Sequence, residues 1–122
     1  MYTSKFNELI EANKNNTHSD LFFEVQNIMS KINKEFEPYF NIYMKIKNNE
    51  ISQDEGINNL RGLLSQLNGQ QLGDLNDLSK MYSTTNCSWQ YYQVAQIVHC
   101  IIMELFDGSD YTRAIQFELE KY

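Results

Sequence analysis

The residues whose types suit nucleophilic chemistry are two histidines and two cysteines: His18, His99, Cys87 and Cys100. His99 and Cys100 are adjacent, but neighbouring residues of a helix point about 100° apart, so the imidazole cannot face the thiol. His18 lies in a polar segment, and no base lies near Cys87 in the sequence to activate it. We therefore expect His99 and Cys100 to be core residues, and we expect the protein not to be an enzyme.

The sequence contains no motif that binds a metal or a cofactor. The patterns H-E-x-x-H, H-x-x-E-H and E-x-x-H are absent, which leaves zinc and di-iron sites without ligands. Residues 74–77, Asp-Leu-Asn-Asp, begin like a calcium loop, but the required glycine and glutamate do not follow. Neither glycine-rich phosphate motif occurs, and no arginine precedes a histidine as it does in some helical nucleases. We expect no metal and no cofactor.

Acidic side chains remain as candidates for binding a partner. Asp74 and Asp77 are three residues apart, as are Asp107 and Asp110, so each pair would share one helix face and offer two carboxylates to a basic patch. Glu104 lies near an expected helix C-terminus, where a negative charge is unfavourable. Glu104 and Asp107 are therefore the more informative acids, although helix-dipole compensation is the alternative explanation, above all for Asp110.

Tyrosines are the second group of candidates, because they offer a large rigid surface with a polar end. Tyr91 and Tyr111 lie outside the apolar stripes of the expected helices. The alternative is that they are core or boundary residues. The predicted partner-binding set is Glu104, Asp107, Asp110, Asp74, Asp77, Tyr91 and Tyr111.

The elements that must position these residues are helices, because apolar residues recur every three to four positions almost throughout. Pro38 either kinks a helix or opens a new one, so we expect six to seven helices. They cover about residues 4–14, 20–36, 39–46, 52–67, 72–81, 88–106 and 110–122. The helix at 88–106 is apolar on most sides and should be central. The predicted fold is an all-α, compact single-domain bundle spanning residues 1–122.

Local signals mark several of these helix ends. Ser52 and Glu55 form an S-x-x-E capping box. Gly69 stands where a helix terminator belongs, and Asp107-Gly108 ends the central helix. Ser109 is the expected cap of the last helix.

Composition and charge exclude several classes of protein. The chain has 122 residues, of which 42% are hydrophobic and 21% charged, with one proline, so it is neither disordered nor collagen-like. Its net charge is −6, and residues 48–122 carry all of it. We therefore expect no direct binding to nucleic acid and no membrane association. Two cysteines without a CxxC pair and no signal segment indicate a cytoplasmic protein.

Residues 45–64, KIKNNEISQDEGINNLRGLL, place a turn before a capped helix. This segment resembles a helical hairpin of colicin D immunity proteins. The whole chain resembles immunity proteins of contact-dependent growth inhibition and colicin-type toxin systems in size, acidity and helical layout. The resemblance implies tight one-to-one binding to a cognate toxin protein, an RNase or DNase domain encoded beside it, but it assigns no functional residue.

The first functional hypothesis is therefore an immunity protein that blocks the basic active-site cleft of a nuclease toxin. The second is a helical adaptor or regulatory subunit of a non-nuclease partner, which would bind through an apolar groove. An enzyme with an unrecognised site and a mimic of nucleic acid are further alternatives, although a mimic would need more than sixteen acids in 122 residues. The oligomeric state stays open.

Overall fold

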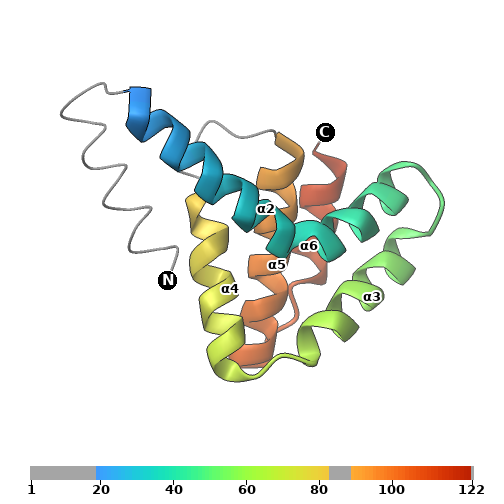
Figure 1. Cartoon of the computed structure of the whole chain (residues 1–122). Coiled ribbons are helices and arrows are strands. Elements are labelled where there is room, and N and C mark those ends of the chain that lie inside the picture. Colours follow the sequence, from blue (N-terminus) through green and yellow to red (C-terminus); the bar gives the residue numbers. More distant parts are fainter. Residues whose placement is uncertain (1–18, 83–88, 122) are drawn as a thin grey trace. The chain divides into compact units, whose positions relative to one another are not determined.

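The computed structural model describes residues 19–82 and 89–121, and all regular structure in these ranges is helical (Figure 1). The chain divides into two compact units, residues 1–36 and 37–122. In the first unit the described residues, 19–36, belong to α2. The second unit contains the rest of α2 and four further helices. The helices are α2 (Ser19–Lys47), α3 (Gln53–Ser65), α4 (Gly69–Met81), α5 (Trp89–Asp107) and α6 (Thr112–Glu120).

The expectation of six to seven helices is not matched, because the described residues form five. The main reason is Pro38, which lies inside α2 and does not separate two helices. A proline cannot donate the helical hydrogen bond to the carbonyl four residues earlier, but the remaining bonds on both sides can carry the helix through it. The helix expected at 4–14 lies outside the described residues.

Two of the predicted helix ends are correct and two are wrong. Ser52 caps α3, its Oγ accepting a hydrogen bond from the Glu55 amide at 3.1 Å, and α5 ends at Asp107, before Gly108 with φ +74°. Gly69 does not terminate α3. It is the first residue of α4, since Asn68 caps that helix in a reciprocal capping box with Gln71.

The prediction for the last helix also needs correction. Ser109 is not the cap of α6, which begins three residues later with Tyr111 at its N-cap position. Asp110 supplies the side-chain acceptor instead, since its carboxylate accepts from the Thr112 amide at 2.9 Å. An aspartate can make this bond, called an Asx turn, to a free amide two residues later. The sequence alone does not show whether Asp110 or Ser109 provides the cap.

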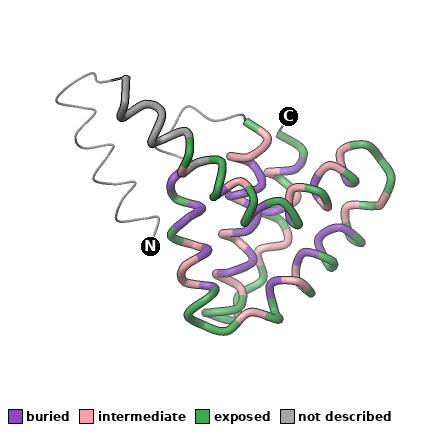
Figure 2. The backbone as a smooth tube through the Cα atoms, in the orientation of Figure 1, coloured by how far each residue is buried: buried purple, intermediate pink, exposed green. Residues whose placement is uncertain are grey.

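Helix α5 packs against α3, α4 and α6, and Figure 2 shows buried positions along its length. Its buried residues include polar Gln93, which is fully enclosed. The other helices supply aliphatic side chains to the same core, which accounts for its stability through burial of apolar surface. The buried residues of α3 to α6 include Ile57, Leu60, Leu64, Leu72, Leu75, Leu78, Val94, Ala95, Ile97, Val98, Ile101, Ile102, Ile115 and Leu119.

Polar contacts in the core connect the end of α2 to α5 and α6. The buried Tyr43 hydroxyl donates to the Gln93 side chain, whose amide donates to the Glu118 carbonyl. The Lys47 ammonium donates to the Leu119 carbonyl. Burial, with a smaller contribution from the Glu118 carboxylate, raises the pKa of Tyr43 to about 12. This network fixes where the C-terminal part of α2 lies on the core.

Glycine allows close packing at the start of α3. Gly56 is buried, and a Cβ atom there would lie 2.3 Å from two carbons of the Ile46 side chain. Such a distance is impossible without movement of Ile46. Gly62 lies on the same helix with open space where its Cβ would be.

Candidate functional site

Arg61 of α3 forms a bidentate ion pair with Glu104 of α5. The Arg61 Nε donates to Glu104 Oε1 at 3.0 Å, and Nη2 donates to Oε2 at 2.7 Å. The Glu104 side chain is only 12% exposed. This hydrogen bond raises the pKa of Arg61 above its ordinary value, mainly because the carboxylate stabilises the charged form. The pair ties α3 to α5, and it explains how an acid is tolerated near a helix C-terminus.

Glu104 also fixes the turn between α5 and α6. Its Oε2 accepts a hydrogen bond from the Tyr111 amide at 2.7 Å. Arg61 reaches the same turn, because Nη2 donates to the Thr112 hydroxyl at 2.7 Å and lies 3.7 Å from the Asp110 carboxylate. Glu104 and Arg61 therefore hold in place the turn on which Asp107 and Asp110 lie.

Asp107 and Asp110 present exposed carboxylates on the two sides of Gly108. Asp107 accepts from the Ser109 amide at 2.8 Å, and this hydrogen bond is the main cause of a pKa below its ordinary value. Asp110 accepts from the Thr112 hydroxyl at 2.5 Å and from the Thr112 amide, and these two bonds lower its pKa as well. Both carboxylates are therefore fully ionised at neutral pH and held in fixed orientations.

Tyr111 lies beside these acids and is half-buried. Its hydroxyl donates to Asp107 Oδ2 at 3.2 Å. The negative charge of Asp107, followed by this hydrogen bond, raises the pKa of Tyr111. The structure thus brings together four of the seven predicted site residues at the α5–α6 turn: Glu104, Asp107, Asp110 and Tyr111.

The other acidic pair lies elsewhere. Asp74 and Asp77 lie on α4, where Asp77 is 3.9 Å from Lys80. The imidazole of His99 contacts Asn76 at 2.5 Å, between Nδ1 and Oδ1. Asp107 follows His99 by eight residues, which is about 12 Å along the axis of α5. The two acidic pairs therefore do not form one cluster.

Tyr91 takes part in packing. Its ring stacks on Phe40 with centroids 4.4 Å apart and on Tyr82 at 6.1 Å, both nearly parallel. Stacked rings at these distances stabilise the contact beyond simple burial. Tyr91 is half-buried, and its ring joins α5 to α2 and to the end of α4.

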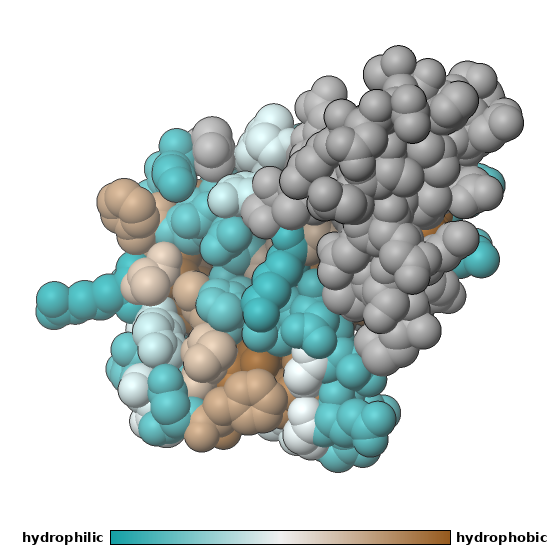
Figure 3. Space-filling view, turned by 90° about the vertical axis from the view of Figure 1, so that its left-hand side faces the viewer, coloured by the Kyte–Doolittle hydropathy of each residue, from teal (hydrophilic) through white to brown (hydrophobic). Residues whose placement is uncertain are grey.

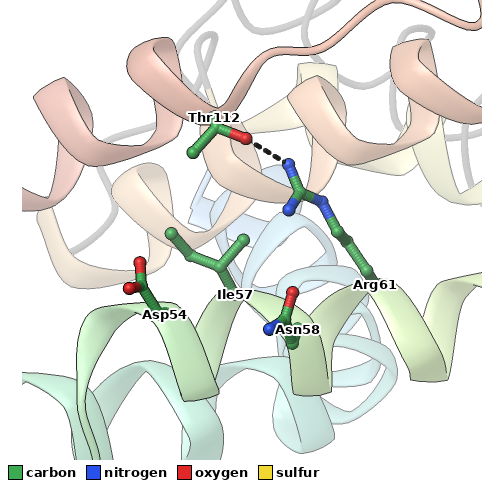
Figure 4. A pocket seen from close by; sticks show the side chains of 5 residues that line it. All are labelled: Asp54, Ile57, Asn58, Arg61 and Thr112. Atoms are coloured by element: carbon green, nitrogen blue, oxygen red, sulfur yellow. Dashed lines mark hydrogen bonds between the residues drawn. The ribbon is translucent and has the colours of Figure 1, made fainter.

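A pocket of about 190 Å³ lies between α3 and the start of α6. Figure 4 shows Ile57 and Arg61 projecting from α3 toward Thr112, with the Asp54 carboxylate at one end and Asn58 between. At the other end the Arg61 side chain reaches across to Thr112, to which the dashed hydrogen bond joins it. The pocket therefore borders directly on the turn that carries Asp107 and Asp110.

Four large hydrophobic side chains in the described ranges are exposed: Trp89, Leu105, Phe106 and Phe117, the last by 67%. Leu105 and Phe106 lie in the last turn of α5, next to Asp107. In the face shown in Figure 3, hydrophobic residues are interrupted by hydrophilic ones. Single exposed apolar side chains are ordinary on protein surfaces, but the two beside Asp107 enlarge the contact area that the turn offers.

Neither of the sequence's nucleophile candidates in the described ranges lies in the pocket. Cys100 is a half-buried free thiol, and burial is the main cause of its raised pKa, which disfavours the reactive thiolate. In residues 19–82 and 89–121 no group of three His, Cys, Asp or Glu is placed to hold a metal ion. Within the same ranges no helix has the length and apolarity needed to cross a bilayer. His18 and Cys87 lie outside the described residues.

Compared with protein-family models, curated proteins and solved structures, the chain matches none of them. Its function is therefore inferred from the residues of this chain.

Sequence reasoning missed Arg61 and Thr112, which organise the site. Arg61 is separated from Glu104 by 43 residues, and no local pattern connects them. One signal was available, because Arg61 is the only basic residue between Lys47 and Lys80. A solitary base in the acidic part of a chain is a reasonable partner for an acid at an unfavourable helix position.

Proposed function

We propose that the protein is an immunity protein that binds and neutralises a cognate toxin, whose basic nuclease cleft receives the acidic α5–α6 turn. The observation that carries the proposal is the pair of ionised, exposed carboxylates of Asp107 and Asp110, held in place by hydrogen bonds. A nuclease cleft is cationic because it must hold phosphate, so fixed carboxylates complement it. Tyr111 and Phe106 add aromatic contact area beside the acids.

In this proposal Glu104 positions the turn and does not touch the toxin. Its carboxylate is largely buried and occupied by Arg61 and by the Tyr111 amide. The free Cys100 thiol is compatible with a reducing cytoplasm, where the toxin would be neutralised. Net charge of −6 favours fast encounter with a cationic partner.

The test begins with capture of partners from the native host by the tagged protein at low and high salt. A captured nuclease is then purified, and its activity is measured with increasing amounts of the protein. We expect inhibition that is complete at one equivalent. A captured partner that has no nuclease activity, or a nuclease that stays active in the complex, would contradict the proposal.

The site is tested with the double variant Asp107→Asn/Asp110→Asn, which removes two charges and leaves Glu104 in place. We expect affinity for the toxin to fall about tenfold, because rim charges contribute through long-range attraction. Asp74→Asn/Asp77→Asn is the matched control, since it removes the same charge from α4. Equal losses in both variants would show that only net charge matters.

A helical adaptor is the second candidate, and the exposed Leu105, Phe106 and Phe117 favour it. Apolar contact is insensitive to salt, whereas contact through Asp107 and Asp110 weakens as salt screens the charges. Binding that survives high salt and is lost in Phe106→Ser, but not in the double Asn variant, would favour the adaptor.

A further inference from the structure

The outer face of α6 carries an exposed aromatic ring in the middle of a helix. Phe117 is 67% exposed, whereas the other three exposed large hydrophobic residues of the described ranges lie in the first or last turn of α5. Ile115 and Leu119 bury the opposite side of α6 in the core. A surface helix ordinarily turns its apolar side chains to the core and polar ones to solvent. The core therefore does not account for the phenylalanine at position 117.

Charged residues flank this ring on the same face of α6. At about 100° per residue, Arg113 and Glu120 lie to one side of Phe117. Ala114 and Lys121 lie to the other side, and all four flanking residues are exposed. None of the three charged side chains forms an ion pair within the part of the chain that the structure describes. Their charges are therefore available for a contact with another molecule.

The order of these residues is self-complementary when two copies of α6 run antiparallel. A two-fold axis between positions 116 and 117 places Arg113 of one copy opposite Glu120 of the other, and the symmetry repeats this contact. On the other edge of the face, Lys121 lies over the small Ala114 of the second copy, which leaves room for its aliphatic stem. Arg113 and Lys121 lie on opposite edges, so the like charges of the two copies do not meet.

We propose that the outer face of α6 binds a second copy of the same chain, as a two-fold symmetric dimer with antiparallel α6 helices. The two Phe117 rings meet at the axis, and two Arg113–Glu120 ion pairs flank them. A second copy fits better than a partner of one sign, because the face carries both signs in the order that antiparallel pairing needs. Helix α6 has nine residues and is about 14 Å long. The interface is therefore smaller than that of a stable dimer, and association is weak and reversible.

Sedimentation equilibrium of the full chain, from about 10 μM to about 1 mM at low salt, measures this association. We expect the average mass to rise with concentration above the 14.4 kDa of the monomer. Phe117→Ser removes the ring from an exposed position and should keep the mass at the monomer value. Phe106→Ser, at an exposed phenylalanine of α5, is the matched control and should behave as the wild type. A monomer at every concentration, or association that persists in Phe117→Ser, would overturn the proposal.

Charge reversal tests the antiparallel pairing. Arg113→Glu brings two acids together in both contacts, and Glu120→Arg brings two bases together. Each variant alone should self-associate about tenfold more weakly, since two exposed ion pairs are replaced by repulsion. An equimolar mixture of the two variants should associate like the wild type, because every contact then joins unlike charges. A mixture that does not associate, or single variants that match the wild type, would overturn the pairing.

Both charge reversals are compatible with a folded α6. An acid near the first turn and a base near the last turn interact favourably with the helix dipole. Circular dichroism should therefore show unchanged helix content in Arg113→Glu and in Glu120→Arg. The double variant Arg113→Glu/Glu120→Arg should regain wild-type association, and its failure to do so would contradict the antiparallel arrangement.

The dimer can be tested independently of the immunity proposal. Asp107→Asn/Asp110→Asn lies outside the α6 face and should self-associate like the wild type, whatever its effect on the toxin. A chain that stays monomeric while Phe117→Ser loses the captured partner would assign the face to that partner and overturn the dimer. Inhibition of a nuclease, or its absence, decides the immunity proposal alone.

Discussion

At the scale of single residues, the contact between Arg61 and Glu104 decides how the acidic turn is presented. Truncating Glu104 leaves a partly buried guanidinium and the Tyr111 amide without their acceptor, and unsatisfied groups of this kind are more costly than the bond itself contributes. We therefore expect Glu104→Ala to lower the free energy of unfolding by about 1–3 kcal/mol, as measured by urea denaturation.

The matched variant for this prediction is Asp77→Ala, which removes an acid that is 51% exposed and 3.9 Å from Lys80. A surface contact of this length contributes little, so we expect a change within about 0.5 kcal/mol. Equal destabilisation by the two variants would show that Glu104 has no special structural role.

Asp107 and Asp110 predict a pH dependence in the acid range. Both pKa values lie below the ordinary 3.8 because hydrogen bonds favour the ionised forms. Between the ordinary and the lowered pKa values the unfolded chain binds more protons than the folded chain. The contribution of the two carboxylates to stability is therefore present above the ordinary pKa and is lost as the pH falls through the pKa values of the folded protein. Asp107→Asn/Asp110→Asn should flatten the acid limb of a plot of stability against pH. An unchanged slope would contradict the assignment.

Tyr43 predicts a second pH dependence of stability, in the alkaline range, where stability falls as pH rises. The pKa of Tyr43 is raised to about 12 in the folded protein from an ordinary 10.0. Tyr43 therefore contributes fully to the free energy of unfolding below pH 10.0, and this contribution is lost as the pH rises through the pKa of the folded protein. Ultraviolet titration should show one tyrosine ionising near the raised value. That late phase should be absent in Tyr43→Phe, and its persistence would assign it to another tyrosine.

At the scale of elements, two glycines of α3 predict opposite effects of the same substitution. Gly62→Ala should stabilise the protein by about 0.5–1 kcal/mol, since alanine restricts the unfolded chain and favours helix, and its Cβ meets nothing. Gly56→Ala should destabilise it by about 1–3 kcal/mol, because the new Cβ displaces Ile46. Thermal unfolding measures both, and stabilisation by Gly56→Ala would disprove the close approach to α2.

The same elements show what the sequence could predict. Helices and the Ser52 cap were predictable, because their hydrogen bonds connect residues three or four positions apart. The start of α6 was not predictable, because Ser109 and Asp110 are equally suited to cap a helix. Only the position of the Thr112 amide decides between them. Pro38 was ambiguous for a similar reason, because packing determines whether a helix continues through it.

The site was predictable only in part. Asp107, Asp110 and Tyr111 lie together because they are close in sequence. The partnership of Arg61 with Glu104 depends on how α3 crosses α5, which periodicity does not specify. The sequence therefore gives no sign that the Glu104 carboxylate is occupied by Arg61 and by the Tyr111 amide.

At the scale of the whole molecule, charge predicts how association depends on salt. All of the net charge of −6 lies in residues 48–122, which include the turn between α5 and α6. We expect the association rate with a cationic partner to fall at least about tenfold between low and high salt, while the dissociation rate changes little. Stopped-flow mixing at several salt concentrations measures both rates. A salt-independent association rate would contradict electrostatic steering.

The order of the helices along the chain has a consequence for biosynthesis. Helices α3 and α4 leave the ribosome before α5, the helix against which they pack. Until residue 107 has emerged, their leucines lack the surface of α5 and are more exposed to other nascent chains and to chaperones. The growing polypeptide can therefore bury these leucines only late in translation. A destabilised α5 should accordingly reduce the yield of the protein in cells more than its equilibrium stability suggests.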